Sequence, residues 1–544
     1  MSSNKRVLLN IPNSDAGKLQ YIIENYSECD AIEMVSHVGF KFLPRSEETC
    51  SELGIMLSEP AQRLLQAFNS AKASNPHKYS SFRDFYTEKT RVNFYSRLFS
   101  EVNISSISFI GLQEHLYKSA LMAADWLSTQ LYRLPYNVTS QQTKNAMISS
   151  EEFDEIKLLY NKDYEIYNAA KATFDKRWLD YTKHHEISLK FDKKLTIHLG
   201  PPKTGTSAIQ SWLHSNREAL LSEGKLYPEH TADANGVSSG NFEQLVTFDT
   251  ENKRAYFDDN KAQSLISRFN ATHCDTLLLS SEHFFYYLIW LFSRFQKAEY
   301  IFYIRHPLGV AESSFHQEVK RHNRTVPFSI SSNIGFSNLL IVNSLAKEFE
   351  CQITYRFYDE KQFINGSLLS DFAHAIRTKV PVPVNAKKVN TQYSPGAIVL
   401  MLKCNTFASE KLRRELDMFL QGYSENIGAF SFVSPSEFND IQCKLKSQVE
   451  QLTETDQSLD YKSMVSLIDH YKKPPMCSEA EINKDLSCII DTMMKFAPTL
   501  ARSLYQEISQ SADETTDDLL RHFNFSWYQK WLFKLVSLAR LQRP

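Results

Sequence analysis

The chain of 544 residues has no apolar run of 18 residues, no Cys-x-x-Cys pair and almost no net charge. Without such an apolar run, no segment of the sequence is expected to span a membrane. The eight cysteines are scattered along a chain too long to need a disulfide framework, so we expect reduced thiols in a cytoplasmic protein. The net charge of −2 provides no basic field for nucleic acid. The apolar stretch near the N-terminus is too short for a signal peptide.

What the sequence does contain is a change of pattern near residue 183. Residues 1–182 mix a short strand at 7–11 with long helical patterns. The polar residues 183–194 are expected to form a linker, in which His184 and His185 face solvent rather than a metal. Residues 195–510 form the main predicted domain, and residues 511–544 an acidic linker followed by an amphipathic helix.

In the main domain, strand patterns alternate with helical patterns. Helical periodicity is found at 207–222, 309–321 and 338–349, and residues 394–510 are helical throughout. Short apolar runs predict strands at 195–199, 277–280, 300–304 and 352–357. This alternation predicts an α/β fold, with a parallel sheet flanked by helices. A second, smaller α/β domain is expected to precede it.

The stretch IHLGPPKTGTSAIQSWL, residues 197–213, joins a predicted strand to a predicted helix. Backbone N–H groups at such a helix start bind anions. Gly205 allows close approach of the backbone, Lys203 adds a positive charge, and Thr204, Thr206 and Ser207 add hydroxyl groups. The alternative is an ordinary capped helix start with a surface lysine. The ATPase loop is excluded, because its lysine follows the last glycine.

A second anion-binding feature follows the predicted strand 300–304. Arg305 comes directly after this strand, where open α/β sheets bind ligands, and its guanidinium fork suits a phosphate. Ser313 follows eight residues later on a predicted helix. Arg305 alone could equally cap neighbouring carbonyls. Two anion-binding features in one α/β unit favour a phosphorylated ligand.

GPPKTGTS at 200–207 and RHPLGVAES at 305–313 together resemble the sulfotransferases that use 3′-phosphoadenosine-5′-phosphosulfate (PAPS). LLLSSEHFF at 277–285 is similar to an element of their bacterial, carbohydrate-modifying members. The resemblance covers about residues 193–505 and implies the P-loop-type sulfotransferase fold. It also implies PAPS as donor substrate without a metal, and a carbohydrate acceptor such as a surface polysaccharide or glycolipid precursor.

The resemblance also implies roles for individual residues. Lys203 would stabilise the leaving group, Arg305 and Ser313 would hold the 3′-phosphate, and the 5′ end would lie against Gly200, Lys203, Thr204, Gly205, Thr206 and Ser207. Glu282 is the leading candidate for the base that accepts the acceptor proton, and His283 is the alternative. As a structural carboxylate, Glu282 would pair with Lys203 or cap the following helix. In NTQYSPGA at 390–397, Gln392 departs from the family pattern, which weakens any role for Asn390.

Contacts to the acceptor are expected from residues 231–260 and 326–336, where Phe242, Tyr256 and Phe257 permit stacking on a sugar. A basic run follows Ser313 and consists of Lys320, Arg321 and Arg324. A solvated helix end is the simpler interpretation of this run, and contact with an anionic acceptor is the alternative.

The first section, which contains VLLNIPNSDAGKLQYIIENY at 7–26, also resembles a sulfotransferase domain, but without its charges. Asn13 stands for the loop lysine, Ala16 for the glycine, Ser58 for the phosphate-binding arginine and Gln66 for the serine. The interval between these remnants leaves little room for a strand bearing a base. We therefore predict a degenerate, non-catalytic domain, the alternative being an unrelated α/β domain.

The C-terminal segment FNFSWYQKWLFKLVSLARLQ places Trp527, Trp531, Leu535 and Leu538 on one helical stripe. We expect the stripe to pack on the protein or a subunit partner. The alternative is peripheral contact with the inner face of a membrane. Two other functions compete with sulfuryl transfer: a non-catalytic nucleotide-binding scaffold, and a P-loop kinase-like phosphotransferase.

Overall fold

The computed structural model divides the chain into two compact units. The first comprises Met1–Pro201, Leu213–Phe302 and Ser337–Thr354, and the second Pro202–Trp212, Tyr303–Phe336 and Tyr355–Pro544. The predicted domain boundaries around residues 183–194 stay predictions. Within the chain, the structure describes residues 6–11, 14, 16–27, 33–36, 52–100, 102–132, 148–230, 240–251, 253–383, 393–423, 428–456, 458–511 and 517–523.

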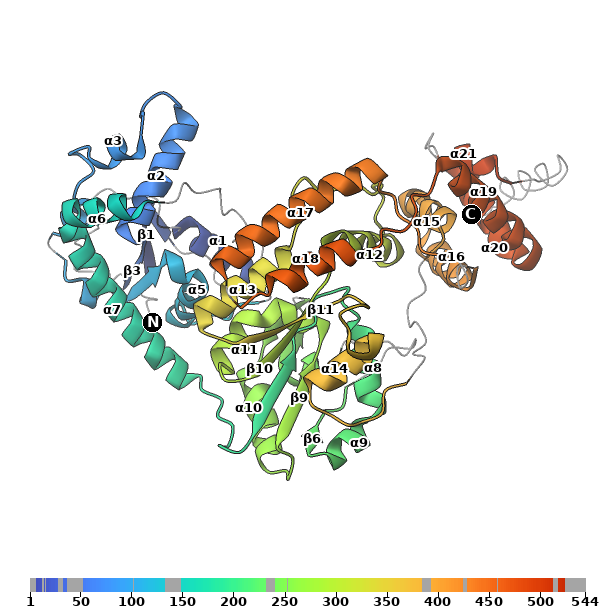
Figure 1. The fold of residues 1–544 in the computed structure, drawn as a ribbon, viewed down its shortest axis with the longest axis horizontal. Helices are drawn as coiled ribbons and strands as arrows, with labels where there is room; N and C mark the ends of the chain where they lie inside the picture. The colour runs from blue at the N-terminus through green and yellow to red at the C-terminus, as the bar shows by residue number, and fades with distance from the viewer. Residues whose placement is uncertain are drawn as a thin grey trace, which may run out of the picture. The chain divides into compact units, whose positions relative to one another are not determined.

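Residues 1–182, called the first section below, form a four-stranded parallel sheet that is covered by helices of the same section (Figure 1). The predicted strand at 7–11 is confirmed as β1. The spatial order is β2-β1-β3-β4, and α5 and α7 pack against β4. The elements are β1 Arg6–Asn10, α1 Ala16–Tyr26, β2 Glu33–Ser36, β3 Glu52–Leu57, α2 Pro60–Ser74, α3 Phe82–Tyr86, α4 Phe94–Leu98, β4 Phe109–Leu112, α5 Leu116–Trp126, α6 Ser150–Leu159 and α7 Asn161–His184.

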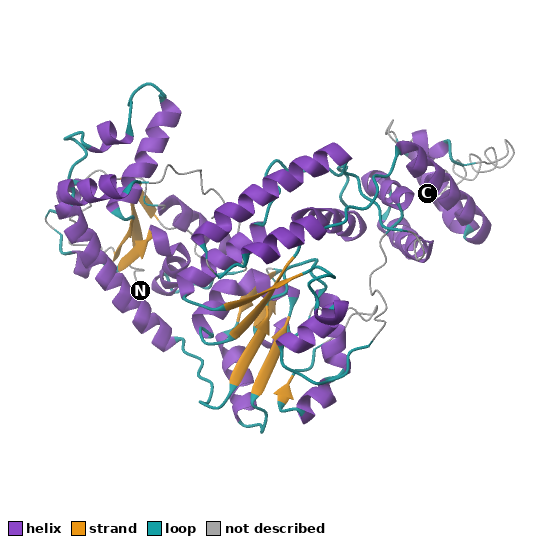
Figure 2. Ribbon diagram, viewed as in Figure 1, coloured by secondary structure: helices purple, strands orange, loops and turns teal. Residues whose placement is uncertain are grey.

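A parallel sheet of five strands flanked by helices follows, and it confirms the predicted α/β class (Figure 2). Its spatial order is β11-β10-β5-β9-β6. The register pairs His198 of β5 with Ser280 of β9 and with Ile301 of β10. The strands are β5 Lys194–His198, β6 Lys225–Leu226, β9 Thr276–Ser280, β10 Glu299–Ile304 and β11 Ile353–Phe357. The helices are α8 Thr206–Ser215, α9 Arg217–Ser222, α10 Asp259–Asn270, α11 Leu288–Arg294, α12 Pro307–Arg321, α13 Ser337–Phe349 and α14 Leu368–Ala375.

The two sheets share a strand order. In the first sheet, the strands that come first, second, third and fourth in the chain are ordered β2-β1-β3-β4. In the second sheet, β5, β9, β10 and β11 are ordered β9-β5-β10-β11 when read from the β6 side. Strand β2 therefore takes the place that β9 has in the second sheet. The interval between Ala16 and Ser58 therefore has room for a strand in this position, and the expectation of little room there was wrong.

The residues after 393 form the predicted helical block. Among the described residues of this block, the only β pairing is an isolated bridge between Ser431 and Met476. Buried apolar side chains of α15, α16, α19 and α20 form one core with Phe315 and Val319 of α12. A hairpin of β7 Val246–Asp249 and β8 Arg254–Phe257 was not predicted. The block contains α15 Pro395–Phe407, α16 Glu410–Tyr423, α17 Pro435–Thr455, α18 Tyr461–His470, α19 Glu479–Phe496, α20 Pro498–Gln510 and α21 Asp517–Leu520.

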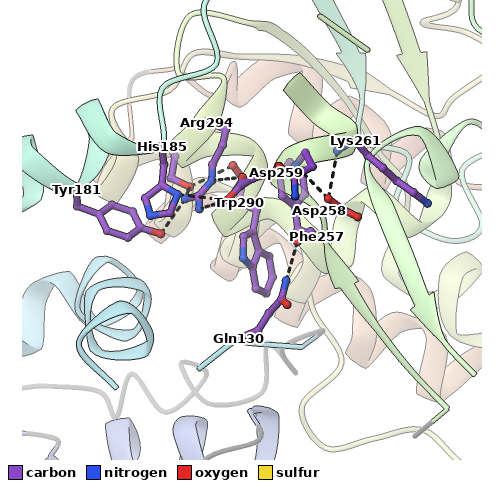
Figure 3. A network of polar contacts seen from close by, with 11 residues as sticks. Gln130, Tyr181, His185, Phe257, Asp258, Asp259, Lys261, Trp290 and Arg294 are labelled. Carbon is purple, nitrogen blue, oxygen red and sulfur yellow. Dashed lines mark hydrogen bonds and ion pairs between the residues drawn. The ribbon is translucent and has the colours of Figure 1, made fainter. Parts of the chain in front are cut away.

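An ion-pair network around the buried Arg294 ties α7 to α10 and α11 (Figure 3). Arg294 donates to both Asp259 oxygens, at 2.9 and 3.0 Å, and to the Tyr181 hydroxyl at 2.9 Å. His185 Nδ1 lies 3.2 Å from Asp259. Although burial opposes it, these contacts from His185 and Arg294 hold the pKa of Asp259 well below its usual value. The expectation that His185 faces solvent in a linker was wrong, because α7 continues to His184 and leads His185 into this network.

Replacing Arg294 with alanine is expected to destabilise the first unit by about 2 kcal/mol, because it removes the hydrogen bonds of a buried guanidinium to Asp259 and Tyr181 and opens a cavity. Chemical denaturation followed by circular dichroism measures this change in the free energy of unfolding. Arg268→Ala, an exposed arginine on the same helix as Asp259, is the matched control and should change it by less than about 0.5 kcal/mol. Equal losses in the two variants would contradict a stabilising role for the network.

Candidate anion-binding site

The predicted anion loop joins β5 to α8 through residues in left-handed conformations. Gly200, Lys203 and Gly205 have φ values of 40°, 73° and 79°. A left-handed lysine is uncommon, and backbone outliers of this kind cluster in ligand-binding loops. Thr204 is buried, and Thr206 begins α8 and is also buried. The loop therefore has the strand-loop-helix geometry that presents backbone N–H groups to an anion.

Gly205 is favoured by its left-handed φ value and by the close packing beneath the loop. A Cβ atom on Gly205 would clash with Cδ2 of Leu368 and lie 3.1 Å from Cε2 of Tyr358, so these side chains would have to shift. The sequence suggested that this glycine lets a ligand approach the backbone. The structure shows that the same lack of a side chain lets α14 and the residues after β11 support the loop.

Arg305 lies against the loop, so the two predicted anion-binding features meet. Its Nη1 donates a hydrogen bond to the Lys203 carbonyl, and its guanidinium lies over the Tyr358 ring, 5.0 Å from the centroid. Tyr358 is in turn fixed by its N–H, which donates to the carbonyl of Ile304 at 2.7 Å. Capping a carbonyl was the alternative interpretation of Arg305. This contact uses one of five guanidinium N–H donors, so it is compatible with phosphate binding as well.

The Lys203 ammonium group reaches α12, where it donates to Oε1 of Gln317. Ser313 precedes Gln317 by four residues, so the two lie on one face of the helix. Gln317 was not identified from the sequence. The only signal for it was its spacing from Ser313. Lys203, Arg305 and the Ser313 face of α12 thus belong to one site in the second unit.

The start of α12 is held by residues that the sequence analysis also missed. His306 Nδ1 accepts from the Leu308 N–H at 3.2 Å, and its ring stacks on Tyr471 with centroids 3.9 Å apart. Burial lowers the pKa of His306 to about 3, so it is neutral and adds no charge next to Arg305. Glu312 accepts from the Ser431 hydroxyl at 2.6 Å. The segment after β10 is therefore fixed by the helical block.

Glu282 and His283 follow β9 and begin a 3₁₀ helix, Glu282–Tyr287. The hydroxyl of Ser281, rather than Glu282, caps the His283 N–H at 3.0 Å. The end of β9 is fixed by Asn241, whose Oδ1 accepts from the Ser280 N–H at 2.8 Å. Both candidate bases are half-buried and belong to the first unit, whereas Lys203, Arg305 and Ser313 belong to the second. Their assignment as base stays a prediction.

The aromatic residues expected to contact an acceptor have different environments. Phe242 lies beside the candidate base His283, with ring centroids 4.8 Å apart. The rings of Tyr256 and Tyr132 have centroids 6.5 Å apart. Phe257 is 2% exposed, and its carbonyl accepts from Gln130 at 3.1 Å. Phe257 is therefore a core residue and not a stacking platform, while Phe242 stays a candidate for one.

The basic run at the end of α12 is only partly solvated. Lys320 is half-buried, and its ammonium group lies 4.0 Å from the centroid of the Tyr393 ring. Arg321 is more exposed and pairs with Asp417 at 3.4 Å. Arg324 pairs with Glu318 and donates to the Val326 carbonyl at 2.9 Å. The interpretation as a solvated helix end is wrong for Lys320, because its side chain covers an aromatic ring.

The first section has no cation in the position that corresponds to Arg305. Ser58 directly follows β3, and the hydroxyl of the buried Tyr95 donates to its carbonyl at 2.9 Å and accepts from its N–H at 3.2 Å. The adjacent Glu59 accepts from the Tyr164 hydroxyl, and Glu114 lies two residues beyond β4. Burial raises the pKa of Glu114 to about 7. These residues after β3 and β4 therefore carry a hydroxyl and two carboxyl groups, and tyrosines of α4 and α7 contact the two after β3.

The remaining residues named in the sequence analysis are only partly described by the structure. Ala16 begins α1 and is buried, and Gln66 is half-buried on α2. Asn13, Asn390, Gln392, residues 231–239 and the stripe of Trp527, Trp531, Leu535 and Leu538 lie outside the described residues. The expectations for them, including membrane contact, stay predictions.

Comparison of the chain with protein-family models, curated proteins and solved structures gave no match. Within the described ranges, no helix is long and apolar enough to cross a bilayer. In the same part of the chain, no group of three or more His, Cys, Asp or Glu side chains is arranged to hold a metal ion.

Proposed function

We propose that the chain is a PAPS-dependent sulfotransferase that transfers a sulfuryl group to a hydroxyl or amine of a carbohydrate acceptor. The observation that carries the proposal is the hydrogen bond from Arg305 to the backbone of Lys203. It brings a phosphate-type arginine fork and a strand-loop-helix anion site together, as a nucleotide with phosphates at both ends of its ribose requires.

Each group of the site has a role in this reaction. Arg305 and Ser313 hold the 3′-phosphate, and the loop from Gly200 to Ser207 holds the 5′-phosphosulfate. The S–O bond to the 5′-phosphate breaks, and a new S–O or S–N bond forms to the acceptor. Lys203 exchanges its contact with Gln317 for the bridging oxygen and stabilises the charge that develops there. The products are the sulfated acceptor and 3′,5′-bisphosphoadenosine.

The acceptor proton must go to a base, for which Glu282 is the first candidate. Glu282 follows β9, whose Ser280 pairs with His198 of β5 in the parallel register, so Glu282 lies at a carboxyl end of the strands, where α/β sheets bind ligands. Glu282→Gln is expected to lower transfer by at least about 100-fold without changing affinity for bisphosphoadenosine. His283→Gln is the matched variant, and a larger loss in His283→Gln would move the assignment to that residue. Activity retained in both variants would exclude both.

The first section is proposed to be a degenerate, non-catalytic copy of the same fold. The shared strand order supports this, as does Ser58 in the place of Arg305 with Tyr95 against it. Glu59 after β3 would repel a nucleotide with several negative charges. For residues 1–182 alone, these observations favour a non-catalytic scaffold over a catalytic domain.

Calorimetric titration of the full-length protein with 3′,5′-bisphosphoadenosine tests the proposal. We expect one site per chain, because Ser58 stands in the first sheet where Arg305 stands in the second. Two sites would overturn the degenerate assignment of the first section. No binding would overturn the sulfotransferase assignment itself. Binding without transfer to any glycan would favour the nucleotide-binding scaffold, and competition by ATP with phosphate transfer would favour the kinase-like alternative.

A further inference from the structure

Lys320 lies one helical turn beyond the residue that contacts Lys203. Gln317 accepts from the Lys203 ammonium group, and Lys320 follows three residues later, about 4.5 Å further along the axis of α12. Ser313, Gln317 and Lys320 have the i, i+4, i+7 spacing of one helix face. Ser313, Gln317 with the Lys203 ammonium group on it, and Lys320 therefore follow one another along this face.

The surroundings of Lys320 hold it in place. Its ammonium group lies over the Tyr393 ring, and the Tyr393 hydroxyl donates to Asp417. Asp417 also pairs with Arg321 at 3.4 Å. A lysine that covers an aromatic ring gains a cation–π contact and loses part of its hydration and mobility. Lys320 is thus a positioned cation and not a freely moving surface charge.

Several positive charges are gathered in this region. Burial lowers the pKa of Lys320 to about 8, an effect that Asp417 opposes and that the charges of Arg321 and Lys203 increase. Burial also lowers the pKa of His316 to about 4, with further lowering by Lys320 and Lys203. The Lys203 ammonium group contacts Gln317, which precedes Lys320 by three residues on α12. Lys203 and Lys320 are thus two like charges that a bound anion would stabilise, whereas His316 is neutral at its lowered pKa.

The charges of the donor are matched by other residues. Under the proposed function, Arg305 meets the 3′-phosphate and Lys203 meets the 5′-phosphosulfate. Lys320 lies beyond Lys203, on the side away from Arg305 along α12. An anion that binds Lys320 would then belong to the acceptor and not to the donor.

We propose that Lys320 recognises a negatively charged group of the acceptor, a carboxylate or an existing sulfate on the sugar. This inference rests on the proposed function and names its substrate class: an acidic glycan. The ring of Tyr393, whose hydroxyl donates to Asp417, positions Lys320 for this contact, and Lys203 remains assigned to the donor.

Two hexasaccharides test the inference, one of alternating uronic acid and N-acetylhexosamine and one of neutral N-acetylhexosamine only. Each is titrated into the full-length protein saturated with 3′,5′-bisphosphoadenosine. The wild-type protein should bind the acidic hexasaccharide at least about tenfold more tightly, and added salt should reduce this preference. Lys320→Gln should remove the preference and Lys320→Arg should keep most of it. Arg321→Gln, the exposed neighbour, should leave it unchanged within about twofold.

Each other outcome counts against a specific statement. Equal binding, or no binding, of the two hexasaccharides by a wild-type protein that binds bisphosphoadenosine overturns the acidic acceptor alone. The same holds if Lys320→Gln keeps the preference. Loss of bisphosphoadenosine binding in Lys320→Gln reassigns Lys320 to the donor and also overturns the inference. A wild-type protein that binds no bisphosphoadenosine overturns the proposed function together with it.

Discussion

Replacing Arg305 with alanine is expected to weaken the binding of 3′,5′-bisphosphoadenosine by at least about 100-fold, because two charge-assisted hydrogen bonds to a phosphate are lost. Each such bond contributes about 1.5–3 kcal/mol, and about 1.4 kcal/mol corresponds to a factor of ten. The guanidinium also contacts the Lys203 carbonyl, so its loss loosens the loop that holds the 5′ end. Isothermal titration calorimetry measures the change in affinity.

Two matched variants separate this effect from a general loss of charge. Arg305→Lys keeps the charge but not the fork, so an intermediate loss of about tenfold is expected. Arg321→Ala removes an arginine at the far end of the same helix and should leave nucleotide affinity unchanged. If Arg305→Ala binds as tightly as the wild type, Arg305 only caps the Lys203 carbonyl, and the phosphate assignment fails.

Replacing Lys203 with alanine is expected to reduce sulfuryl transfer much more than nucleotide binding. Removing one preorganised group that stabilises developing charge lowers turnover by about 100- to 1,000-fold. Bisphosphoadenosine lacks the group whose departure Lys203 assists, so its affinity should fall by only about tenfold. Transfer of a labelled sulfuryl group from PAPS to a mixture of neutral and uronic-acid oligosaccharides gives the rate, and calorimetry gives the affinity.

Gln317→Ala is the control for this experiment, because it removes the partner of the Lys203 ammonium group and leaves the lysine in place. Its transfer rate should stay within about tenfold of the wild-type rate, since a neutral hydrogen bond contributes only about 1 kcal/mol. If the turnover of Lys203→Ala falls no more than its nucleotide affinity, Lys203 contributes equally to ground-state and transition-state binding. It would then not stabilise the leaving group.

The sequence predicted local features of the second sheet well. The strands expected at 277–280 and 300–304 are β9 and β10, with bounds shifted by one residue. The helix expected at 309–321 is α12, which begins two residues earlier at Pro307, a residue suited to a helix start. These elements have strong apolar periodicity or clear start signals. The α/β class could therefore be read from local patterns.

The elements missed were short or were decided by distant contacts. The strands of the β7–β8 hairpin have four residues each, too few for a clear alternation. A helix was expected without interruption over 207–222, but it ends at Ser215 and restarts at Arg217. His185 was assigned to a linker because its partner Asp259 is 74 residues away. Periodicity describes one element at a time and carries no information on such pairs.

In the candidate site too, sequence motifs identified some residues, and the others depend on contacts that form only in the folded chain. Lys203, Arg305 and Ser313 were named from motif spacing, and the structure brings Lys203 and Arg305 together. Gln317, Tyr358, Tyr471 and the environment of Lys320 could not be named in this way. Each depends on which side chain faces the loop after the chain has folded.

The partner of Lys203 has a consequence for how the site exchanges its ligands. An amide oxygen orders the ammonium group while leaving its net charge in place, so an incoming anion still meets a full positive charge. A carboxylate at Gln317 would form an internal ion pair and compete with every anion that enters. The neutral amide therefore makes a weak contact, which an incoming anion displaces readily and which forms again when the anion leaves. Under the proposed function, the site takes up one nucleotide and releases another in each turnover, and a weak internal contact of this kind would favour that exchange.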